Sequence, residues 1–162
     1  MDMTISELKQ PAALPAELQE CLGFLLARVG IATKLAAFEE FQRAGFGPYQ
    51  YGVLAVLGEG AKETQATIAD TLDVDRGQLV GVLDELEKDG LIERRRDQND
   101  RRRHMVSITP AGKKRLVKMR ALVKNVEDSL LGALDTDERA TLQDFLQRIA
   151  ASNDLRFQQA KE

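Results

Sequence analysis

The feature that most restricts the fold of this chain is a change of hydrophobic period at Gly90. Before Gly90, apolar residues recur every three or four positions, which predicts one helix over about 65–71 and another that ends near Lys88. Asp75 is the expected N-cap of the second helix, and Gln78 completes a D-x-x-Q capping pattern. Because the turn between the two helices is short, the sequence predicts a helix-turn-helix unit.

After Gly90 the pattern becomes that of two short strands joined by a polar hairpin. Residues 91–95 and 104–108 are the predicted strands, and Val106 and Ile108 alternate with polar neighbours in the second. A helix-turn-helix unit followed by such a hairpin predicts a winged helix.

Helical patterns continue on both sides of this unit. One long helix is predicted over 16–44, with apolar residues on two faces, and the GFGP sequence that follows should end it. A helix beginning at Pro48 leads into the unit, Thr109 caps the helix that leaves it, and Asp135 or Thr136 begins the last helix. These flanking helices carry more apolar surface than a small winged helix needs, which predicts association between two copies of the chain.

The expected fold is therefore mainly α-helical with a small β-wing, in which dimerisation helices flank a winged helix-turn-helix domain. The predicted parts are a flexible lead-in (1–14), a dimerisation helix (15–47), the winged helix-turn-helix domain (48–112), C-terminal dimerisation helices (113–152) and a tail (153–162). The tail is expected to fray after Ser152.

Charge is distributed unevenly along the chain. Between Arg94 and Arg120, eleven Lys or Arg residues and two acidic residues give +9, whereas the remainder carries twelve basic and twenty-four acidic residues, giving −12. DNA phosphates respond to a local patch rather than to the net charge, so the basic stretch indicates double-stranded DNA as a partner. The alternative is that this stretch is only a solvated surface.

Few residues are available for other chemistry. Cys21 and His104 are the only cysteine and the only histidine, so we expect no disulfide, no metal site and no catalytic residues. The N-terminus lacks the pattern of a signal peptide, and no apolar run is long enough to span a membrane. The sequence predicts a cytoplasmic protein that is not an enzyme, uses no cofactor and has no membrane partner.

The second helix of the unit is expected to lie in the major groove, where its first residues meet base edges. Arg76 suits guanine and Gln78 suits adenine through paired hydrogen bonds. Val80 either contacts a thymine methyl group or is simply exposed. Gly77 and Gly81 would allow close approach of the backbone to DNA, although a tight helix crossing explains Gly81 equally well.

The hairpin supplies the second predicted contact with DNA. Arg101, Arg102 and Arg103 are expected to enter the minor groove, and Asp100 to hold a wing arginine in position rather than to touch DNA. The complete predicted set of DNA-contacting residues is Thr64, Gln65, Arg76, Gly77, Gln78, Val80, Gly81, Arg96, Arg101, Arg102 and Arg103.

The stretch DVDRGQLVGVLDELEKDGLIERRRDQNDRRRHMVSITPAG resembles the signature of MarR-family regulators. The shared features are a recognition helix ending in LExxG, then LIxR, a D-x-x-D-R-R wing and the T-P-x-G start of the next helix. The strong match covers residues 64–112. It implies an obligate homodimer, pseudo-palindromic operator DNA and repression that a small molecule or an oxidant relieves. Gly81 departs from the common pattern, in which a polar or basic residue often occupies this position.

In MarR-like proteins, aromatic or phenolic acids or their derivatives bind between the dimer helices and the winged unit. Arg28 interrupts an apolar stripe, so it could receive a ligand carboxylate, or it could extend to solvent or pair with an acid of the partner subunit. The other candidate effector-binding residues, each of which could instead be core, are Phe24, Phe46, Tyr49, Tyr51 and Met119.

Cys21 supports an alternative, a thiol-based redox repressor, because peroxide-sensing members of the family carry a reactive cysteine near the start of the first helix. A helix N-terminus can activate a thiol. However, Cys21 lies about two residues early, and Ala27 stands where a tyrosine is expected, which favours a small semi-buried residue. A further alternative is an architectural DNA-binding protein without operator specificity.

Overall fold

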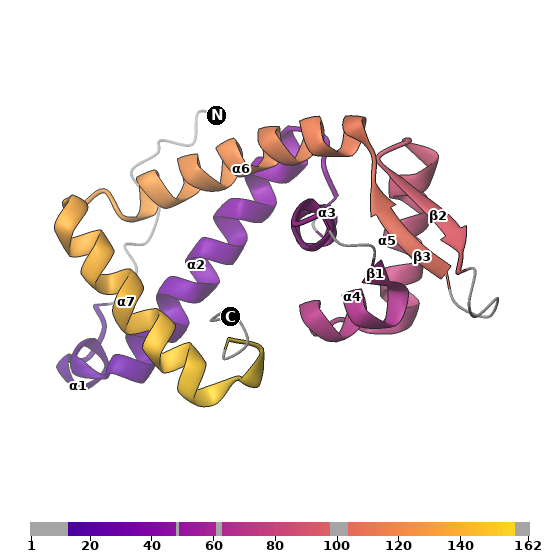
Figure 1. Ribbon diagram of the computed structural model, residues 1–162. Helices are drawn as coiled ribbons and strands as arrows, with labels where there is room; N and C mark the ends of the chain where they lie inside the picture. Colours follow the sequence, from indigo (N-terminus) through magenta and orange to yellow (C-terminus); the bar gives the residue numbers. More distant parts are fainter. Residues whose placement is uncertain (1–12, 48, 61–62, 98–103, 158–162) are drawn as a thin grey trace, which may run out of the picture.

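The computed structural model describes residues 13–47, 49–60, 63–97 and 104–157. Figure 1 shows a winged unit of α3, α4, α5 and three strands at one end of the molecule, and a long arm of α2, α6 and α7 at the other. The predicted mainly α-helical fold with a small β-wing is confirmed. The elements are α1 (Ala16–Glu20), α2 (Leu22–Arg43), α3 (Gln50–Gly58), β1 (Glu63–Thr64), α4 (Gln65–Leu72), α5 (Arg76–Lys88), β2 (Ile92–Arg96), β3 (His104–Ile108), α6 (Pro110–Leu130), α7 (Thr136–Asn153) and the 3₁₀ turn η2 (Leu155–Phe157).

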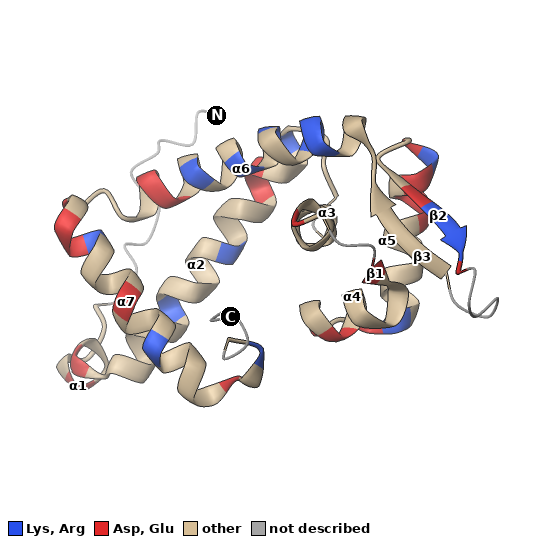
Figure 2. Ribbon diagram, in the orientation of Figure 1, with Lys and Arg blue, Asp and Glu red and all other residues tan. Residues whose placement is uncertain are grey.

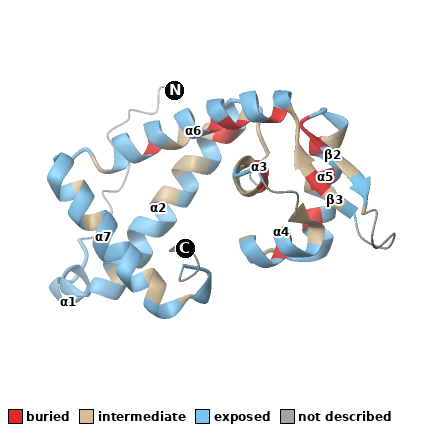
Figure 3. Ribbon diagram, viewed as in Figure 1, coloured by how far each residue is buried: buried red, intermediate tan, exposed pale blue. Residues whose placement is uncertain are grey.

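The hydrophobic core lies inside the winged unit and where that unit meets α6. In Figure 3 the buried segments gather around α3, α5 and the strands, whereas most of the arm is exposed. The apolar stripe of each helix in the unit supplies this core, as the sequence periods predict. Its most deeply buried side chains are Val53, Leu54, Leu57, Ile68, Leu79, Leu83, Leu86, Ile92, Val106 and Met119.

Two predicted helix starts are confirmed, that of α5 in the winged unit and that of α6 where the chain leaves it. Asp75 Oδ1 accepts hydrogen bonds from the backbone N–H groups of Gly77 and Gln78, at 2.8 and 3.1 Å, and so caps α5. The Thr109 hydroxyl caps α6, in which Pro110 is the first residue. Both caps fix the direction of a helix that follows a short connection.

A complete capping box occurs at α7 instead of α5. Asp135 Oδ1 accepts a hydrogen bond from the Glu138 N–H, and the Glu138 carboxylate accepts one from the Asp135 N–H, both at 2.9 Å. At α5 the described contacts contain only the half of the box that Asp75 supplies. Asp135 is therefore the N-cap of the last helix, and Thr136 is its first residue.

The three strands form an antiparallel sheet in the order β1-β3-β2. The predicted hairpin is present, with Arg94 opposite Val106 near its centre. The sequence did not predict β1, because two residues are too few to display an alternating pattern. β1 pairs with the first half of β3 and thereby holds the start of α4 against the wing.

The long helix predicted over 16–44 is wrong in one respect, because the chain leaves the helical conformation at Cys21. This residue has an extended backbone, with φ −80° and ψ 108°, so it ends α1 and precedes α2. The apolar stripe runs across the break from Leu18 to Leu22, and its spacing therefore gave no sign of it. Gly45 has φ +72° and ends the second part where predicted.

Two further boundaries differ from expectation. The predicted first residue of the next helix, Pro48, lies outside the described residues, and α3 is assigned from Gln50 to Gly58. The predicted boundary of the frayed tail, after Ser152, is too early, because α7 continues to Asn153 and η2 follows it. Arg156 in η2 pairs with Asp154, which holds this turn together.

The arm carries many apolar side chains that are exposed among the described residues. Leu22 is 76% exposed on α2, and Phe145 and Ile149 are each 50% exposed on α7. These side chains line grooves between α2, α6 and α7, the more apolar of which has a volume of about 470 Å³. Among the described helices, none is both long and apolar enough to cross a membrane.

Candidate nucleic-acid interface

Helix α5 has one buried face and one exposed face. Leu79, Leu83 and Leu86 anchor it in the core, and the Asp75 cap fixes its first turn. The predicted base-reading residues lie on the opposite side, so the fold leaves them available to a partner. All five of these residues are exposed: Arg76, Gly77, Gln78, Val80 and Gly81.

Arg76 extends from the first turn of α5 and is 70% exposed. Its guanidinium lies 3.8 Å from the carboxylate of Asp70 in α4, a separation at the limit of an ion pair. Both partners are largely solvated, so this contact contributes little stability, and Arg76 can leave it at small cost.

The two glycines of α5 have different surroundings. A Cβ added to Gly77 would lie 2.9 Å from the capping Asp75 Oδ1, so the helix cap itself favours a glycine there. A Cβ added to Gly81 would meet nothing within 4 Å. Within the described chain, the proposed tight helix crossing at Gly81 is therefore wrong, and close approach by another molecule remains the prediction.

Thr64 and Gln65 occupy the start of α4 and are half-buried. The Thr64 hydroxyl accepts a hydrogen bond from the Thr67 N–H at 3.1 Å and lies 2.8 Å from the Thr67 hydroxyl. Thr64 therefore has a structural function as the cap of α4. Its predicted contact with DNA stays a prediction.

The hairpin leaves the described part of the structure at its tip. Arg96 is exposed at the end of β2, opposite His104, whereas Asp100, Arg101, Arg102 and Arg103 lie outside the described residues. The minor-groove contacts and the positioning function of Asp100 therefore stay predictions.

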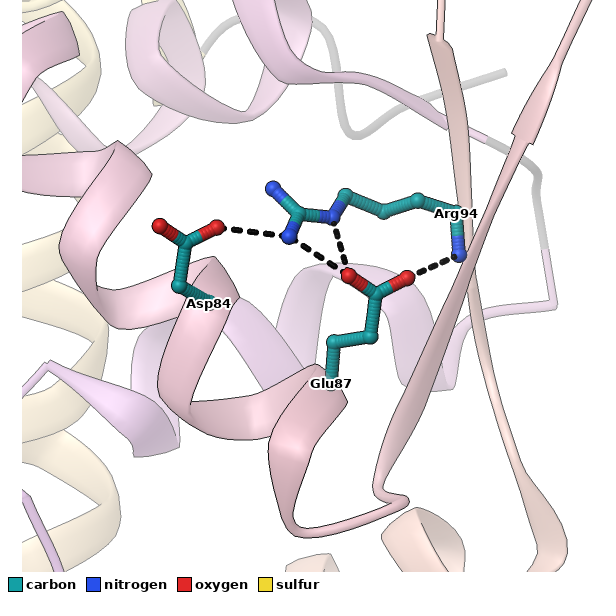
Figure 4. Close-up of polar contacts among 3 residues, drawn as sticks. All are labelled: Asp84, Glu87 and Arg94. Carbon is teal, nitrogen blue, oxygen red and sulfur yellow. Dashed lines mark hydrogen bonds and ion pairs between the residues drawn. The ribbon is translucent and has the colours of Figure 1, made fainter.

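Sequence reasoning missed a polar cluster that joins the hairpin to α5. Arg94 of β2 donates hydrogen bonds to Glu87 and Asp84, both on α5 (Figure 4). The Arg94 guanidinium holds the pKa of the Glu87 carboxyl below its usual value, and the same hydrogen bond raises the pKa of Arg94. The motif LExxGLIxR contains Glu87 and Arg94, but their spacing alone does not reveal that they meet.

A second group of cations lies on the first half of α6. Figure 2 shows these basic segments along the helix where it leaves the sheet. They belong to the basic stretch that the sequence shows between Arg94 and Arg120. The exposed members on α6 are Lys113, Lys114, Lys118 and Arg120.

The predicted effector-binding residues do not form one site within the chain. Phe24 and Arg28 lie in the first half of α2, and Arg28 is exposed with no ion pair among the described residues. Tyr49 is also exposed, whereas Met119 is completely buried in the core.

The other two candidates pack against the core near the start of α3. The Phe46 ring lies under the guanidinium of Arg115, whose central carbon is 4.7 Å from the ring centre. The ring of Tyr51 lies 5.7 Å from that of Phe41. Arg115 is thus a cation beside an aromatic candidate, which the sequence did not single out.

Cys21 is an exposed free cysteine, and it occupies the N-cap position of α2. The expectation of a semi-buried residue is therefore wrong for the single chain. Among the described residues, no group of three or more His, Cys, Asp or Glu side chains is arranged to hold a metal ion.

An exposed recognition helix beside a three-stranded sheet defines this molecule as a winged-helix protein. A family model of the MarR family matches residues 44–103. A putative transcriptional regulatory protein for the hcr operon of Thauera aromatica is 35% identical over 133 residues, which cover 79% of this chain and 78% of that protein.

Solved structures give the same result. The transcriptional repressor CouR bound to a 23-mer DNA duplex superposes with a TM-score of 0.74 at 33% identity, covering 86% of this chain and 99% of that one. CouR from Rhodococcus jostii RHA1 bound to p-coumaroyl-CoA gives 0.69 at 31% identity, covering 84% and 96%. Wild-type MarR from E. coli gives 0.71 at 27% identity, covering 86% and 98%.

The chain therefore belongs to the MarR family and is a DNA-binding transcription regulator with a winged-helix fold. The resemblance seen in the sequence is confirmed. Because the relatives are transcriptional regulators, the prediction that the chain is not an enzyme is confirmed as well.

Proposed function

We propose that the chain is a repressor that binds pseudo-palindromic operator DNA as a homodimer and leaves it when a small aromatic effector binds. The observation that carries this proposal is the exposed face of α5, where Arg76 and Gln78 follow a fixed cap while the opposite face is anchored in the core. A rigid helix with exposed polar residues at its N-terminus suits the major groove. The DNA-bound CouR structure supports the same use of the fold.

In this proposal each part of the interface reads a different feature of DNA. Arg76 and Gln78 discriminate bases, while Arg101, Arg102 and Arg103 enter the minor groove, with Asp100 positioning them. Thr64, Gln65 and Arg96 contact the phosphate backbone beside the groove. A repressor of this kind acts at the chromosome, so we place it in the cytoplasm.

The homodimer is proposed to form through residues 15–47 and 113–152, leaving 48–112 as the DNA-binding domain. The support is the exposed apolar surface of α2 and α7, which a single chain leaves in contact with water. Two copies related by a two-fold axis would also present two copies of α5, as a pseudo-palindromic operator requires.

The effector is proposed to be a phenolic acid or its coenzyme A thioester. The CouR structure with p-coumaroyl-CoA supports this class of ligand. The pairing of Arg115 with Phe46 offers an aromatic face and a cation together, which suits an aromatic ring linked to a carboxylate or phosphate.

The test is DNA binding by fluorescence anisotropy, comparing the promoter beside the gene with a random duplex of equal length. We expect Arg76→Ala to weaken promoter binding by about tenfold and random binding much less, since one bidentate contact is worth 1–3 kcal/mol. Arg43→Ala, which removes another exposed, ion-paired arginine, is the matched control and should change neither. Equal affinity of the unmodified protein for both duplexes would refute the operator-specific function and favour an architectural one.

The effector is tested on the same protein–DNA complex by adding p-coumarate, p-coumaroyl-CoA or coenzyme A alone. We expect one of the two aromatic compounds to release DNA and coenzyme A alone to leave it bound. If only an oxidant released DNA, and Cys21→Ser abolished that response, the redox alternative would replace the effector proposal.

A further inference from the structure

We infer that Arg94 is a positioning residue that locks the wing onto the recognition helix, through the two carboxylates of Glu87 and Asp84. This inference rests on the proposed DNA-reading function, because it concerns how the two DNA-contacting parts are held relative to one another. It gives Arg94 a function distinct from that of the adjacent arginines in the basic run.

The contacts join two elements at several points. Arg94 Nε donates to Glu87 Oε2 at 2.8 Å, and Arg94 Nη2 donates to the same oxygen at 2.5 Å and to Asp84 Oδ1 at 2.6 Å. The backbone N–H of Arg94 donates to Glu87 Oε1 at 3.2 Å. Figure 4 shows the guanidinium reaching from the strand to both carboxylates on the helix. Because side chain and backbone both bond to α5, the strand cannot rotate about its axis without breaking several of these bonds.

The charge and burial of the cluster argue against a direct DNA contact by Arg94. Two carboxylates face one guanidinium, so the group has a net charge of −1 and repels phosphate. The Arg94 side chain is 20% exposed, whereas that of the adjacent Arg95 is 78% exposed. Arg95 pairs only with Glu93, on its own strand, in the described contacts.

The alternation of β2 explains this difference between adjacent arginines. Ile92, Arg94 and Arg96 lie on one face of the strand, and their exposure increases from buried to exposed toward the wing tip. Arg94 therefore stands at the rim of the core, beside the last turns of α5, while the strand continues to the wing.

Locking these elements together would favour binding because the wing and α5 must enter different grooves at the same time. If the hairpin moved freely, DNA binding would have to order it, and this loss of freedom would weaken the complex. A preformed angle between α5 and the wing avoids that loss. It affects operator binding more than random binding, because only the operator complex needs both contacts in register.

The experiment compares Arg94→Met with Arg95→Met, which removes the same charge one residue further along the same strand. In the free protein, we expect Arg94→Met to accelerate amide hydrogen exchange in β2 and β3 while α3 stays protected, and Arg95→Met to change neither. With DNA, Arg94→Met should weaken promoter binding by about tenfold, the equivalent of one hydrogen bond to a charged group, and leave the salt dependence of binding unchanged.

Glu87→Gln serves as a milder variant in case Arg94→Met fails to fold, and it should produce a smaller change in the same direction. The charge-reversed double variant, Glu87→Arg with Arg94→Glu, should recover most of the protection from hydrogen exchange and most of the affinity for the promoter. Unchanged exchange in the free protein would overturn the inference without involving DNA. A parallel loss of promoter and random binding, with a weaker salt dependence, would overturn it in favour of a phosphate contact. If the unmodified protein did not prefer its promoter, the proposed function would be refuted. The hydrogen-exchange result would still show whether Arg94 holds the wing against α5.

Discussion

Gly81 lies on the exposed face of α5, and a Cβ added to it would meet no other atom within 4 Å. Glycine inside a helix costs about 1 kcal/mol relative to alanine, since the unfolded chain gains freedom and no side chain packs. No contact within the described chain requires this cost. A partner that approaches the backbone at Gly81 would explain the glycine, and the proposed partner is DNA.

Gly81→Ala should raise the free energy of unfolding by about 0.5–1 kcal/mol, because the residue is helical and the added methyl group meets nothing. The same methyl group should weaken promoter binding, because it would separate α5 from DNA. Urea denaturation and anisotropy measure the two effects. Gly23→Ala, at another open position, is the control and should leave promoter binding unchanged. A destabilised Gly81→Ala protein would contradict the open surroundings of this position.

For single residues, the sequence predicted which polar side chains are exposed better than it predicted which residues they contact. Arg76 and Gln78 were placed correctly on the exposed face because the cap and the apolar stripe fix the rotation of α5. Arg94 was counted with the basic surface, although internal acids neutralise it. That pairing depends on how β2 packs against α5, and no local pattern encodes this packing.

Among the helices and strands, the start of α6 shows how the T-P-x-G motif allows a helix to pack closely against the sheet. The Thr109 hydroxyl donates a hydrogen bond to the Gly90 carbonyl at 2.7 Å and accepts one from the Gly112 N–H. It therefore joins the start of α6 to the turn that follows α5. A Cβ added to Gly112 would lie 2.1 Å from the Leu91 carbonyl oxygen and 2.7 Å from the Ile108 side chain. The T-P-x-G pattern thus brings α6 into direct contact with the sheet.

Gly112→Ala should lower the free energy of unfolding by about 3 kcal/mol, because backbone must move to admit the methyl group. Thermal or urea denaturation checks this prediction. Ala111→Gly, which alters the neighbouring exposed residue in the same turn, should have a much smaller effect. Equal stability of Gly112→Ala and the unmodified protein would mean that α6 does not approach the sheet this closely.

The Glu87–Arg94 contact predicts a pH dependence whose sign follows from the lowered pKa of Glu87. A depressed folded-state pKa stabilises the fold above the unfolded value of about 4.3, and this stabilisation is lost as pH falls through the folded value. The stability difference between the unmodified protein and Glu87→Gln should therefore shrink from pH 6 toward pH 3. Urea denaturation measures it, and in the Arg94→Met background the difference should be small at every pH. A difference that grew with acidity would contradict the contact.

The order and type of the elements were predictable because each strong helix has a cap or a stop that the sequence displays. The break at Cys21 and the short strand β1 were not predictable, for two separate physical reasons. The apolar stripe continues unchanged across Cys21, while β1 exists only because β3 offers it hydrogen-bond partners. Elements of this kind depend on tertiary contacts rather than on local preference.

For the whole molecule, the arm exposes an apolar surface that the winged unit cannot cover. Figure 3 shows α1, α7 and most of α2 as exposed, in contrast with the buried centre of the winged unit. The sequence predicted an excess of apolar helix faces, but it could not show that grooves between α2, α6 and α7 stay open. Leu26, Leu142 and Leu146 line these grooves from two helices.

Leu146→Asp should separate the proposed dimer, because a carboxylate in an apolar interface loses its hydration without gaining a partner. Light scattering after size exclusion should then give the 18.0 kDa of one chain instead of twice that mass. Val117→Asp changes an exposed apolar residue of α6 that does not line the grooves, and it should stay dimeric.

The same variant tests how the arm and α5 depend on one another. A single chain presents one α5 and can occupy only half of a pseudo-palindromic operator, so promoter affinity should fall by at least a hundredfold as the second tethered contact is lost. Anisotropy with the promoter and with a single half-site separates the two possibilities. Leu146→Asp should bind both duplexes equally weakly, whereas the unmodified protein should strongly prefer the complete site. A monomeric Leu146→Asp protein with undiminished promoter affinity would show that one winged unit suffices for operator recognition, and the arm would then need another function.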